Sequence, residues 1–236
     1  MADFKRKQRK KKNKSESAIR NDENTILGEA IDYHHKGNLK NAEKAYRSLI
    51  EYGTINYSVF SNLGIICQQS ERTEEATKFY KKAIELNPNH PDAYINIGAL
   101  YKDLGKLDEA LFFTLQSIRL QPRSATALRN LGGIYHDLGN LEQALTSTLK
   151  SLEIDPENAT ALSNLGSIYK ELGKLDKALS PTIRSIELDP NNFRAHMKLS
   201  LIYQGLGVID KAIDANLASL KIKPDDPYVL NYLGYG

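Results

Sequence analysis

The sequence predicts an all-α protein built from one repeating helical hairpin, and three observations predict this fold class. The segment ALSNLGSIYKELGKLDKAL at residues 161–179 nearly copies ALRNLGGIYHDLGNLEQAL, which stands 34 residues earlier. Within each copy the apolar residues fall at helical spacing in two runs that a glycine separates. A proline recurs at the end of most copies, where it ends a helix because it has no N–H to donate to the helix ladder.

The chain begins with a basic segment, residues 1–22, which holds nine Lys or Arg against three acidic residues, while the remainder carries a net charge of −3. The segment has one aromatic residue and no apolar periodicity, so we expect a disordered tail. Three roles stay open for it: a solubilising leader, weak attraction to nucleic acid or an anionic lipid surface, and docking on an acidic partner.

From residue 23 onward the chain divides without gaps into repeats of 34 residues, which we number from position 1 to position 34. We expect two helices in each of six repeats, at residues 23–56, 57–90, 91–124, 125–158, 159–192 and 193–226. In the repeat that starts at residue 159 the apolar runs are Leu162, Leu165, Ile168, Tyr169 and Leu172, then Leu175, Ala178, Leu179, Ile183 and Ile186.

Small residues recur at two positions of the repeat. Position 20 is alanine in all six repeats, and position 8 is glycine in four, at Gly64, Gly98, Gly132 and Gly166. A glycine inside a helix costs about 0.5 to 1 kcal/mol relative to alanine. We therefore expect it to permit a close helix crossing, for which the alanines would supply the matching space.

With tyrosine at position 11 and proline at position 32 in five repeats each, this pattern resembles the tetratricopeptide repeat over residues 23–226. The resemblance implies a right-handed superhelical solenoid of helix-turn-helix repeats. It also implies that the first helices line a concave groove that grips extended peptides.

The chain departs from the family pattern at position 24, where the family favours an aromatic residue. Tyr46 and Tyr80 follow the pattern, but the later repeats have Thr114, Thr148, Thr182 and Asn216. We expect a differently packed second-helix layer in those repeats. Pro181 lies inside a predicted second helix, where it should remove one hydrogen bond and bend the helix.

Residues 227–236 match only the start of a seventh repeat. A half-hairpin cannot bury its own apolar face, so this segment predicts either a partial repeat of a longer protein or a short capping helix.

The sequence offers little that points to catalysis. Cys67 is the single cysteine, it replaces the tyrosine of position 11, and we expect it to behave as a small buried hydrophobe. The five histidines have no metal-binding spacing, and the glycines follow no strand that could form a phosphate loop. We expect no metal, no cofactor and no enzyme activity. Without an apolar run of ~18 residues or a signal peptide, we expect a cytoplasmic protein with no transmembrane segment.

Asparagine recurs at position 6 of the first helix, at Asn62, Asn96, Asn130 and Asn164. A carboxamide both donates and accepts, so a row of them can hydrogen-bond a peptide backbone without reading its side chains. The row resembles the asparagine ladder in the repeat domain of O-linked N-acetylglucosamine transferases. The alternative is a role in the local fold.

A second candidate site combines Asn130 and Asn164 with Arg194 and Lys198, whose positions place them on the same surface of three consecutive repeats. This set is similar to the carboxylate clamp by which chaperone-adaptor repeats hold an acidic C-terminal tail. Thr126 stands where the family has a lysine, which implies a weaker or altered anion site. The charges at positions 12 and 13 are mixed in sign, which favours solvated helix faces over a nucleic-acid groove.

We therefore expect a protein-interaction scaffold or adaptor that binds an extended peptide or partner protein, with its oligomeric state left open. The alternative is the substrate-recruiting repeat domain of a larger glycosyl, sulfo or methyl transferase whose catalytic part is absent from this chain.

Overall fold

The structure is a computed structural model that describes residues 22–232, so the predicted tail at residues 1–21 lies outside the described part of the chain. Residue 22, the last that the sequence assigned to the tail, already belongs to a helix that runs to residue 35. Throughout residues 22–232 every regular element is a helix, as the sequence predicts. None of these helices has the length and apolar character that crossing a lipid bilayer requires.

The helices that follow residues 22–35 alternate between 13 and 14 residues from α3 to α12. They are α2 (Leu39–Glu51), α3 (Tyr57–Gln69), α4 (Thr73–Leu86), α5 (Pro91–Asp103), α6 (Leu107–Leu120), α7 (Ala125–Asp137), α8 (Leu141–Ile154), α9 (Ala159–Glu171), α10 (Leu175–Leu188), α11 (Phe193–Gly205), α12 (Ile209–Ile222) and α13 (Pro227–Tyr232).

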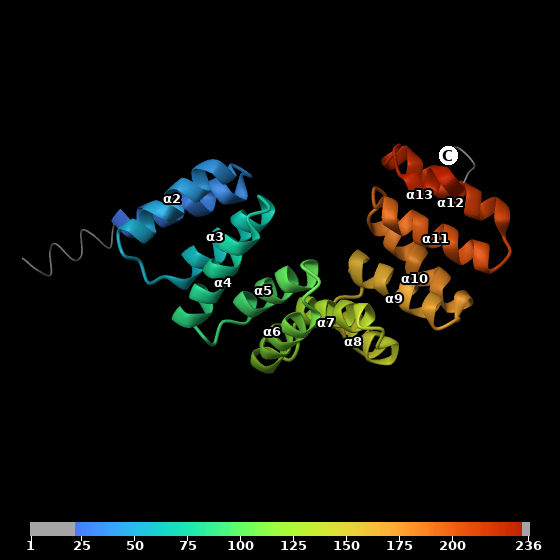
Figure 1. The fold of residues 1–236 in the computed structure, drawn as a ribbon, viewed down its shortest axis with the longest axis horizontal. Helices are drawn as coiled ribbons and strands as arrows, with labels where there is room; N and C mark the ends of the chain where they lie inside the picture. Colours follow the sequence, from blue (N-terminus) through green and yellow to red (C-terminus); the bar gives the residue numbers. More distant parts are fainter. Residues whose placement is uncertain (1–21, 233–236) are drawn as a thin grey trace, which may run out of the picture. The chain divides into compact units, whose positions relative to one another are not determined.

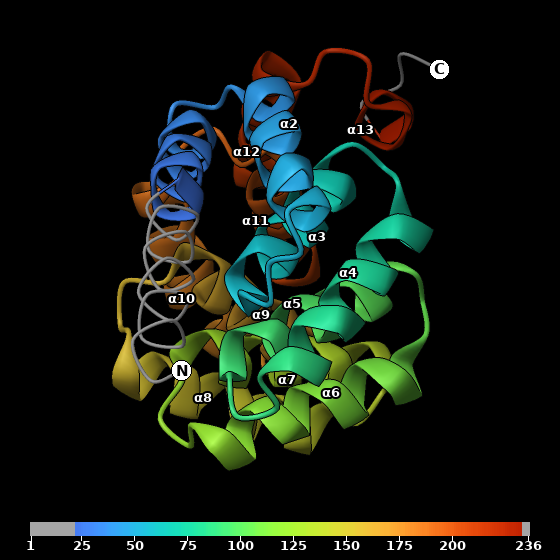
Figure 2. The same ribbon diagram turned by 90° about the vertical axis from the view of Figure 1, so that its left-hand side faces the viewer.

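The helices form two compact units, which we call the N-terminal unit (up to Leu100) and the C-terminal unit (from Tyr101). In the N-terminal unit α2 packs on α3, and α3 pairs with α4 as a hairpin (Figure 2). The C-terminal unit contains the hairpins α7–α8, α9–α10 and α11–α12 (Figure 1). There each second helix contacts the following first helix, and α9 also contacts both α7 and α11.

Glycine makes the turn inside most hairpins, at position 15. Gly105, Gly139, Gly173 and Gly207 all have φ between 70° and 74°, a left-handed conformation that glycine adopts without steric cost. In the α3–α4 hairpin Glu71 takes the same conformation, with φ at 59°. It is the one non-glycine residue with positive φ in the described part of the chain.

The glycines of position 8 permit a close helix crossing, but the residue that fills the space is not the one we expected. A Cβ on Gly132 or Gly166 would overlap the hydroxyl oxygen of Thr148 or Thr182, at position 24 of the same repeat. The backbone carbonyls of the position-20 alanines lie further away, at 3.3 Å from Ala144 and 3.4 Å from Ala178. The side chain of position 24 therefore packs over the glycine, and the alanine lets the backbones approach.

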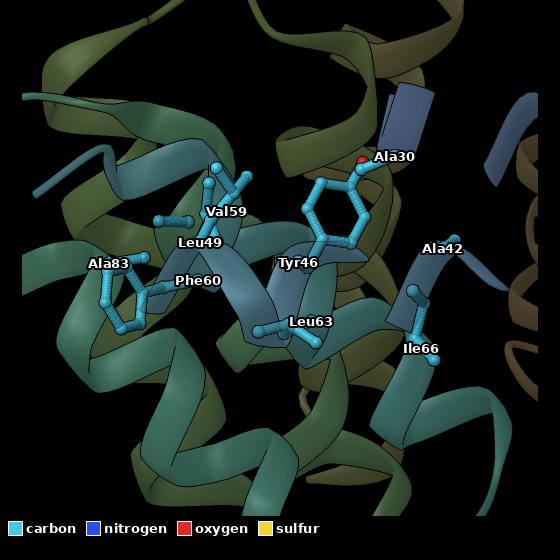
Figure 3. Packing of buried hydrophobic residues seen from close by; sticks show 10 residues of the cluster. Ala30, Ala42, Tyr46, Leu49, Val59, Phe60, Leu63, Ile66 and Ala83 are labelled. Carbon is cyan, nitrogen blue, oxygen red and sulfur yellow. The ribbon is translucent and has the colours of Figure 1, made fainter. Parts of the chain in front are cut away.

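The packing at position 24 differs between the repeats, as the sequence predicts. In the N-terminal unit the buried ring of Tyr80 lies over Gly64, and the buried ring of Tyr46 packs with apolar residues of α2 and α3 (Figure 3). In the C-terminal unit the corresponding threonines and Asn216 are buried as well. Small polar side chains thus replace two aromatic rings at the centre of the hairpins.

Pro181 lies inside α10, which continues without a break from Leu175 to Leu188. Its ring is buried, and the missing N–H leaves one carbonyl of the preceding turn without its helical donor. The proline is therefore accommodated within the helix and does not end it.

Candidate functional site

The two asparagines of the N-terminal unit are half-buried on their first helices and contact the previous repeat. Asn62 donates from Nδ2 to the hydroxyl of Tyr46, at 2.9 Å. Asn96 reaches Ser61, with 3.5 Å between Nδ2 and Oγ. Asn62 is thus committed to the fold by a hydrogen bond to a buried tyrosine, which agrees with the alternative that the sequence left open.

Asn130 and Asn164 in the C-terminal unit are half-buried on α7 and α9 and less firmly held. The side-chain amide oxygen of Asn130, Oδ1, accepts a hydrogen bond from the guanidinium of its neighbour Arg129, at 3.3 Å. Asn164 lies beside Gly133, because its Nδ2 is 3.9 Å from the point where a Cβ on that glycine would stand. The side chain of Asn164 makes no hydrogen bond with any residue that the structure describes. Its donor and acceptor are therefore available to a ligand.

Lys198 occupies position 6 of its repeat, so it continues the row that the four asparagines begin. Its ammonium donates to Oγ of Ser163 on α9, at 2.9 Å. Burial, together with the nearby positive charges of Arg194 and Lys170, lowers the pKa of Lys198 to about 8. This cation is desolvated and close to like charges, so an anion placed beside it would be attracted strongly.

A groove of about 570 Å³ lies next to Lys198, between α11 and the start of α13. Its lining residues include Phe193, Arg194, Met197, Lys198, Leu201 and Lys223. Two cations make cation–π contacts with the Phe193 ring: Nζ of Lys223 lies 4.8 Å from the ring centroid and Cζ of Arg194 lies 5.7 Å from it. The groove therefore combines apolar walls with three cationic side chains and one carboxylate, that of Asp226, which pairs with Lys223 at 3.0 Å.

Polar side chains at positions 12 and 13 pair with each other between consecutive repeats. Lys102 pairs with Asp137, at 3.0 Å, and Nε2 of His136 lies 3.0 Å from the Glu171 carboxylate. The series stops at Lys170, because position 13 of the next repeat is Gly205 and offers no carboxylate. The four paired side chains remain 26–40% exposed, and Lys170 adds to the positive charge near Lys198.

Cys67 is buried, as expected, but its surroundings are not purely apolar. Its thiol donates to the Glu75 carboxylate, with 3.4 Å between the heavy atoms, and burial raises its pKa to about 12. Glu43 and Glu75 also lie near one another, within 4.8 Å of the thiol, but both carboxylates pair with Arg72 and with Arg47. Two arginine charges already neutralise the oxygens that a metal ion would need.

Two features of these surfaces were missed at the level of the sequence. The network of Glu43, Arg47, Arg72 and Glu75 joins α2 to the α3–α4 hairpin through four ion pairs. Because its members stand at different positions of two repeats, no spacing rule reveals it. Lys198, by contrast, could have been assigned to the asparagine row from the repeat register alone.

Comparisons with known proteins agree with this architecture. Four family models described as tetratricopeptide or TPR repeats match residues 57–90, 79–112, 132–173 and 159–192. No curated protein matches the chain.

Several solved structures share the fold at low identity. A chain in the crystal structure of the APC/C hetero-tetramer Cut9-Hcn1 matches with a TM-score of 0.84 and 19% identity, over 89% of this chain and 42% of that one. This chain thus spans less than half the length of that neighbour. PilF of Pseudomonas aeruginosa matches with a TM-score of 0.78 and 15% identity, over 93% of this chain and 100% of that one.

YrrB, described as a TPR protein with an unusual peptide-binding site, matches with a TM-score of 0.60 and 23% identity, over 81% of this chain and 99% of that one. At these identities the likeness shows the fold alone.

Proposed function

The chain belongs to the tetratricopeptide repeat family, and we propose that it is an interaction scaffold whose first-helix surface binds an extended peptide or a partner protein. The fold is consistent with such a scaffold. The observation that carries the proposal is the pair of half-exposed carboxamides, Asn130 and Asn164, on successive first helices that also contact each other. The peptide-binding site named for YrrB adds a precedent for peptide binding on this fold.

In this proposal the carboxamides bind the peptide backbone and the cationic groove binds its acidic end. Asn164 can donate and accept at the same time, as a peptide group requires. Arg194 and Lys198 lie one helical turn apart on α11, so both can approach one carboxylate. Lys223 and the Phe193 ring would contact the side chain next to that carboxylate.

A binding role also suits the chemistry of the one cysteine. A thiol whose pKa is raised to about 12 is protonated at neutral pH, and Cys67 is inaccessible to a substrate. We therefore propose recognition rather than catalysis.

The first experiment measures the affinity of acidic-ended peptides with free and amidated C-termini. We expect the free form to bind more tightly to the wild type, and Arg194→Ala or Lys198→Ala to remove most of this difference. A charge-assisted hydrogen bond contributes about 1.5 to 3 kcal/mol, so the loss should be at least tenfold. Lys177→Ala, an exposed lysine on α10, is the matched control. Equal affinity for the two peptide forms would disprove the carboxylate site.

The second experiment tests the carboxamides. Replacing Asn130 and Asn164 with alanine should leave the melting temperature unchanged, because alanine is the better helix former, yet weaken binding by about 0.5 to 1.5 kcal/mol per hydrogen bond. Asn62→Ala should instead lower stability, because it removes the partner of Tyr46. Unfolding of the Asn130 and Asn164 variant would show that these side chains serve the fold.

Calorimetry adds a readout that depends on Lys198 itself. An anion bound beside this ammonium favours its charged form and raises its pKa above about 8, so binding near pH 8 should take up a proton. Titrations in two buffers of different ionisation enthalpy measure this uptake, and Lys198→Met should abolish it. Tight binding without proton uptake would place the anion elsewhere.

A further inference from the structure

The second helices of the C-terminal unit expose aliphatic residues on the side that faces away from their first helices. In α6, α8, α10 and α12 the residues at positions 20, 24 and 27 of the repeat are buried, and in the last three of these helices position 23 is buried as well. Position 25 lies on the opposite side and is aliphatic in every one of these helices. The exposed fractions are 41% for Leu115, 38% for Leu149, 37% for Ile183 and 41% for Leu217.

Position 21 lies one helical turn before position 25 and is also aliphatic, at Leu111, Leu145, Leu179 and Ile213. We call these eight residues the aliphatic face. Along α10 they border a shallow hollow of about 500 Å³, between Asp176 and Glu187. Apolar side chains that recur on the outside of consecutive helices indicate an interaction surface more strongly than single exposed residues do.

The repeat fold itself does not require an aliphatic face, because the N-terminal unit lacks one. Positions 21 and 25 are Glu43 and Arg47 in α2, and Thr77 and Lys81 in α4. Both helices pack against their neighbours with polar residues at these positions, and in α2 Glu43 and Arg47 form ion pairs with the next repeat. The aliphatic residues are therefore a property of the C-terminal unit and not of the hairpin.

One edge of the aliphatic face is acidic. Position 18, one turn before position 21, is Asp108, Glu142, Asp176 and Asp210 in the four helices. All four carboxylates are exposed, and none takes part in an ion pair within the described residues. An acid in the first turn also interacts favourably with the helix dipole, but that interaction leaves the carboxylate free for a cation.

We propose that the aliphatic face binds a basic amphipathic helix of a partner protein. The apolar side of that helix packs on positions 21 and 25, and its Lys or Arg residues pair with the carboxylates of position 18. Helices recognised in this way present apolar residues at i, i+3, i+4 and i+7, which suits a surface whose own apolar residues are one turn apart. The site is separate from the first-helix surface, so the chain can hold two partners.

The test uses the full chain and three labelled 18-residue peptides. The first is an amphipathic helix of Leu and Lys, the second has the same composition in scrambled order, and the third is the amphipathic Leu and Glu analogue. Fluorescence anisotropy should show at least tenfold tighter binding of the first peptide than of the other two. Its affinity should fall as salt is raised, because exposed charges are screened.

Two pairs of substitutions then separate the apolar and the charged contributions. Leu149→Ser with Ile183→Ser should weaken binding of the Leu and Lys peptide at least tenfold. Glu142→Gln with Asp176→Asn changes no apolar contact, and should weaken binding several-fold while reducing its salt dependence. Lys81→Ser, at position 25 of the N-terminal unit, is the matched control and should change nothing.

Several results would overturn the proposal. Equal binding of the amphipathic and scrambled peptides would show that an amphipathic helix is not what the face recognises. Equal binding of the Leu and Glu analogue would show that positive charge on the partner is not required. Unchanged affinity in both double variants would show that the peptide binds to another surface of the protein. If sedimentation shows a dimer that Leu149→Ser with Ile183→Ser abolishes, the face contacts a second copy of this chain and no basic helix is needed.

Discussion

The N-terminal and C-terminal units build the same hairpin from different side chains. At position 24 the N-terminal unit uses the rings of Tyr46 and Tyr80, whereas the C-terminal unit uses threonine or asparagine. At positions 21 and 25 of the second helices the N-terminal unit is polar and the C-terminal unit is aliphatic. The backbone of the repeat therefore fixes neither its interior side chain nor its outer surface, and the outer surface is free to acquire a binding role.

The two units also satisfy their polar groups differently. In the N-terminal unit the tyrosine hydroxyls find partners, since Tyr80 donates to Gln68 at 2.9 Å and Tyr46 accepts from Asn62. In the C-terminal unit Thr182 donates to the carbonyl of Ala178 at 2.8 Å, while the buried hydroxyl of Thr148 has no partner among the described residues. Small residues at position 24 thus fit the close crossing at some cost in hydrogen bonding.

The largest expected effect comes from giving the N-terminal unit the side chain of the C-terminal unit. Tyr80→Thr removes a fully buried ring that lies over Gly64, so we expect the free energy of unfolding to fall by about 3 kcal/mol. Urea unfolding followed by circular dichroism measures the change. A loss below about 1 kcal/mol would mean that the two ways of filling the hairpin are interchangeable.

The close crossing in the C-terminal unit can be tested by adding one methyl group. Gly166→Ala should destabilise the protein by about 1 to 3 kcal/mol, although alanine favours the helix, because the new Cβ would overlap the buried Thr182 hydroxyl. Combining it with Thr182→Ala should recover much of the loss, since the overlapping atom is then absent. If the single variant is more stable than the wild type, the crossing is looser than the structure indicates.

The ion pairs that join α2 to the α3–α4 hairpin in the N-terminal unit predict a pH dependence of stability. Arg72 lowers the pKa of Glu43, so the stabilisation from this carboxylate is present above the unfolded pKa of ~4.3 and is lost as the pH falls through the lower folded pKa. The four side chains are partly exposed, and we expect Glu43→Gln to cost about 1 kcal/mol at pH 7. Denaturant titrations should show the difference between wild type and variant shrinking below about pH 4. A difference that stays constant down to pH 2 would mean that the charge of Glu43 contributes nothing.

The smallest effect concerns the hairpin turn, where Glu71 stands in place of glycine. Glu71→Gly should stabilise the protein by about 0.5 to 1 kcal/mol, because a side chain at φ of 59° is strained. Gly139→Ala places a side chain in the same conformation in the C-terminal unit and should destabilise it by a similar amount. Thermal melts of the two variants measure these opposite shifts.

Much of this fold could be predicted because residues that begin or end a helix recur at fixed positions of the repeat. The prolines and the cap residues fix where each helix starts, so the first helices begin at Tyr57, Pro91, Ala125, Ala159 and Phe193, all at position 1 of the register. Asn56, Ser124, Asn158 and Asn192 precede four of these helices and accept hydrogen bonds from their first turns.

Periodicity alone did not separate the inside of the second helix from its outside. Ile183 belongs to the apolar run that predicted the helix, yet it is exposed, while the polar Thr182 beside it is fully buried. Hydrophobicity predicted the helix correctly and the buried side only in part, because position 24 is buried by its contact with the facing helix whether its side chain is an aromatic ring or a small polar group. The partners of Cys67 were likewise unpredictable, since they come from neighbouring helices through side-chain directions that spacing does not encode.

The burial of Cys67 makes it a native reporter of local opening. A thiol whose pKa is raised to about 12 and which solvent cannot reach is alkylated only when its surroundings open, after which it reacts as an ordinary cysteine. The ratio of its alkylation rate in the folded protein to that of a free thiol therefore gives the free energy of this opening. Because Cys67 is the only cysteine, a single mass shift would follow the N-terminal unit alone, without mutations, whether or not a peptide is added.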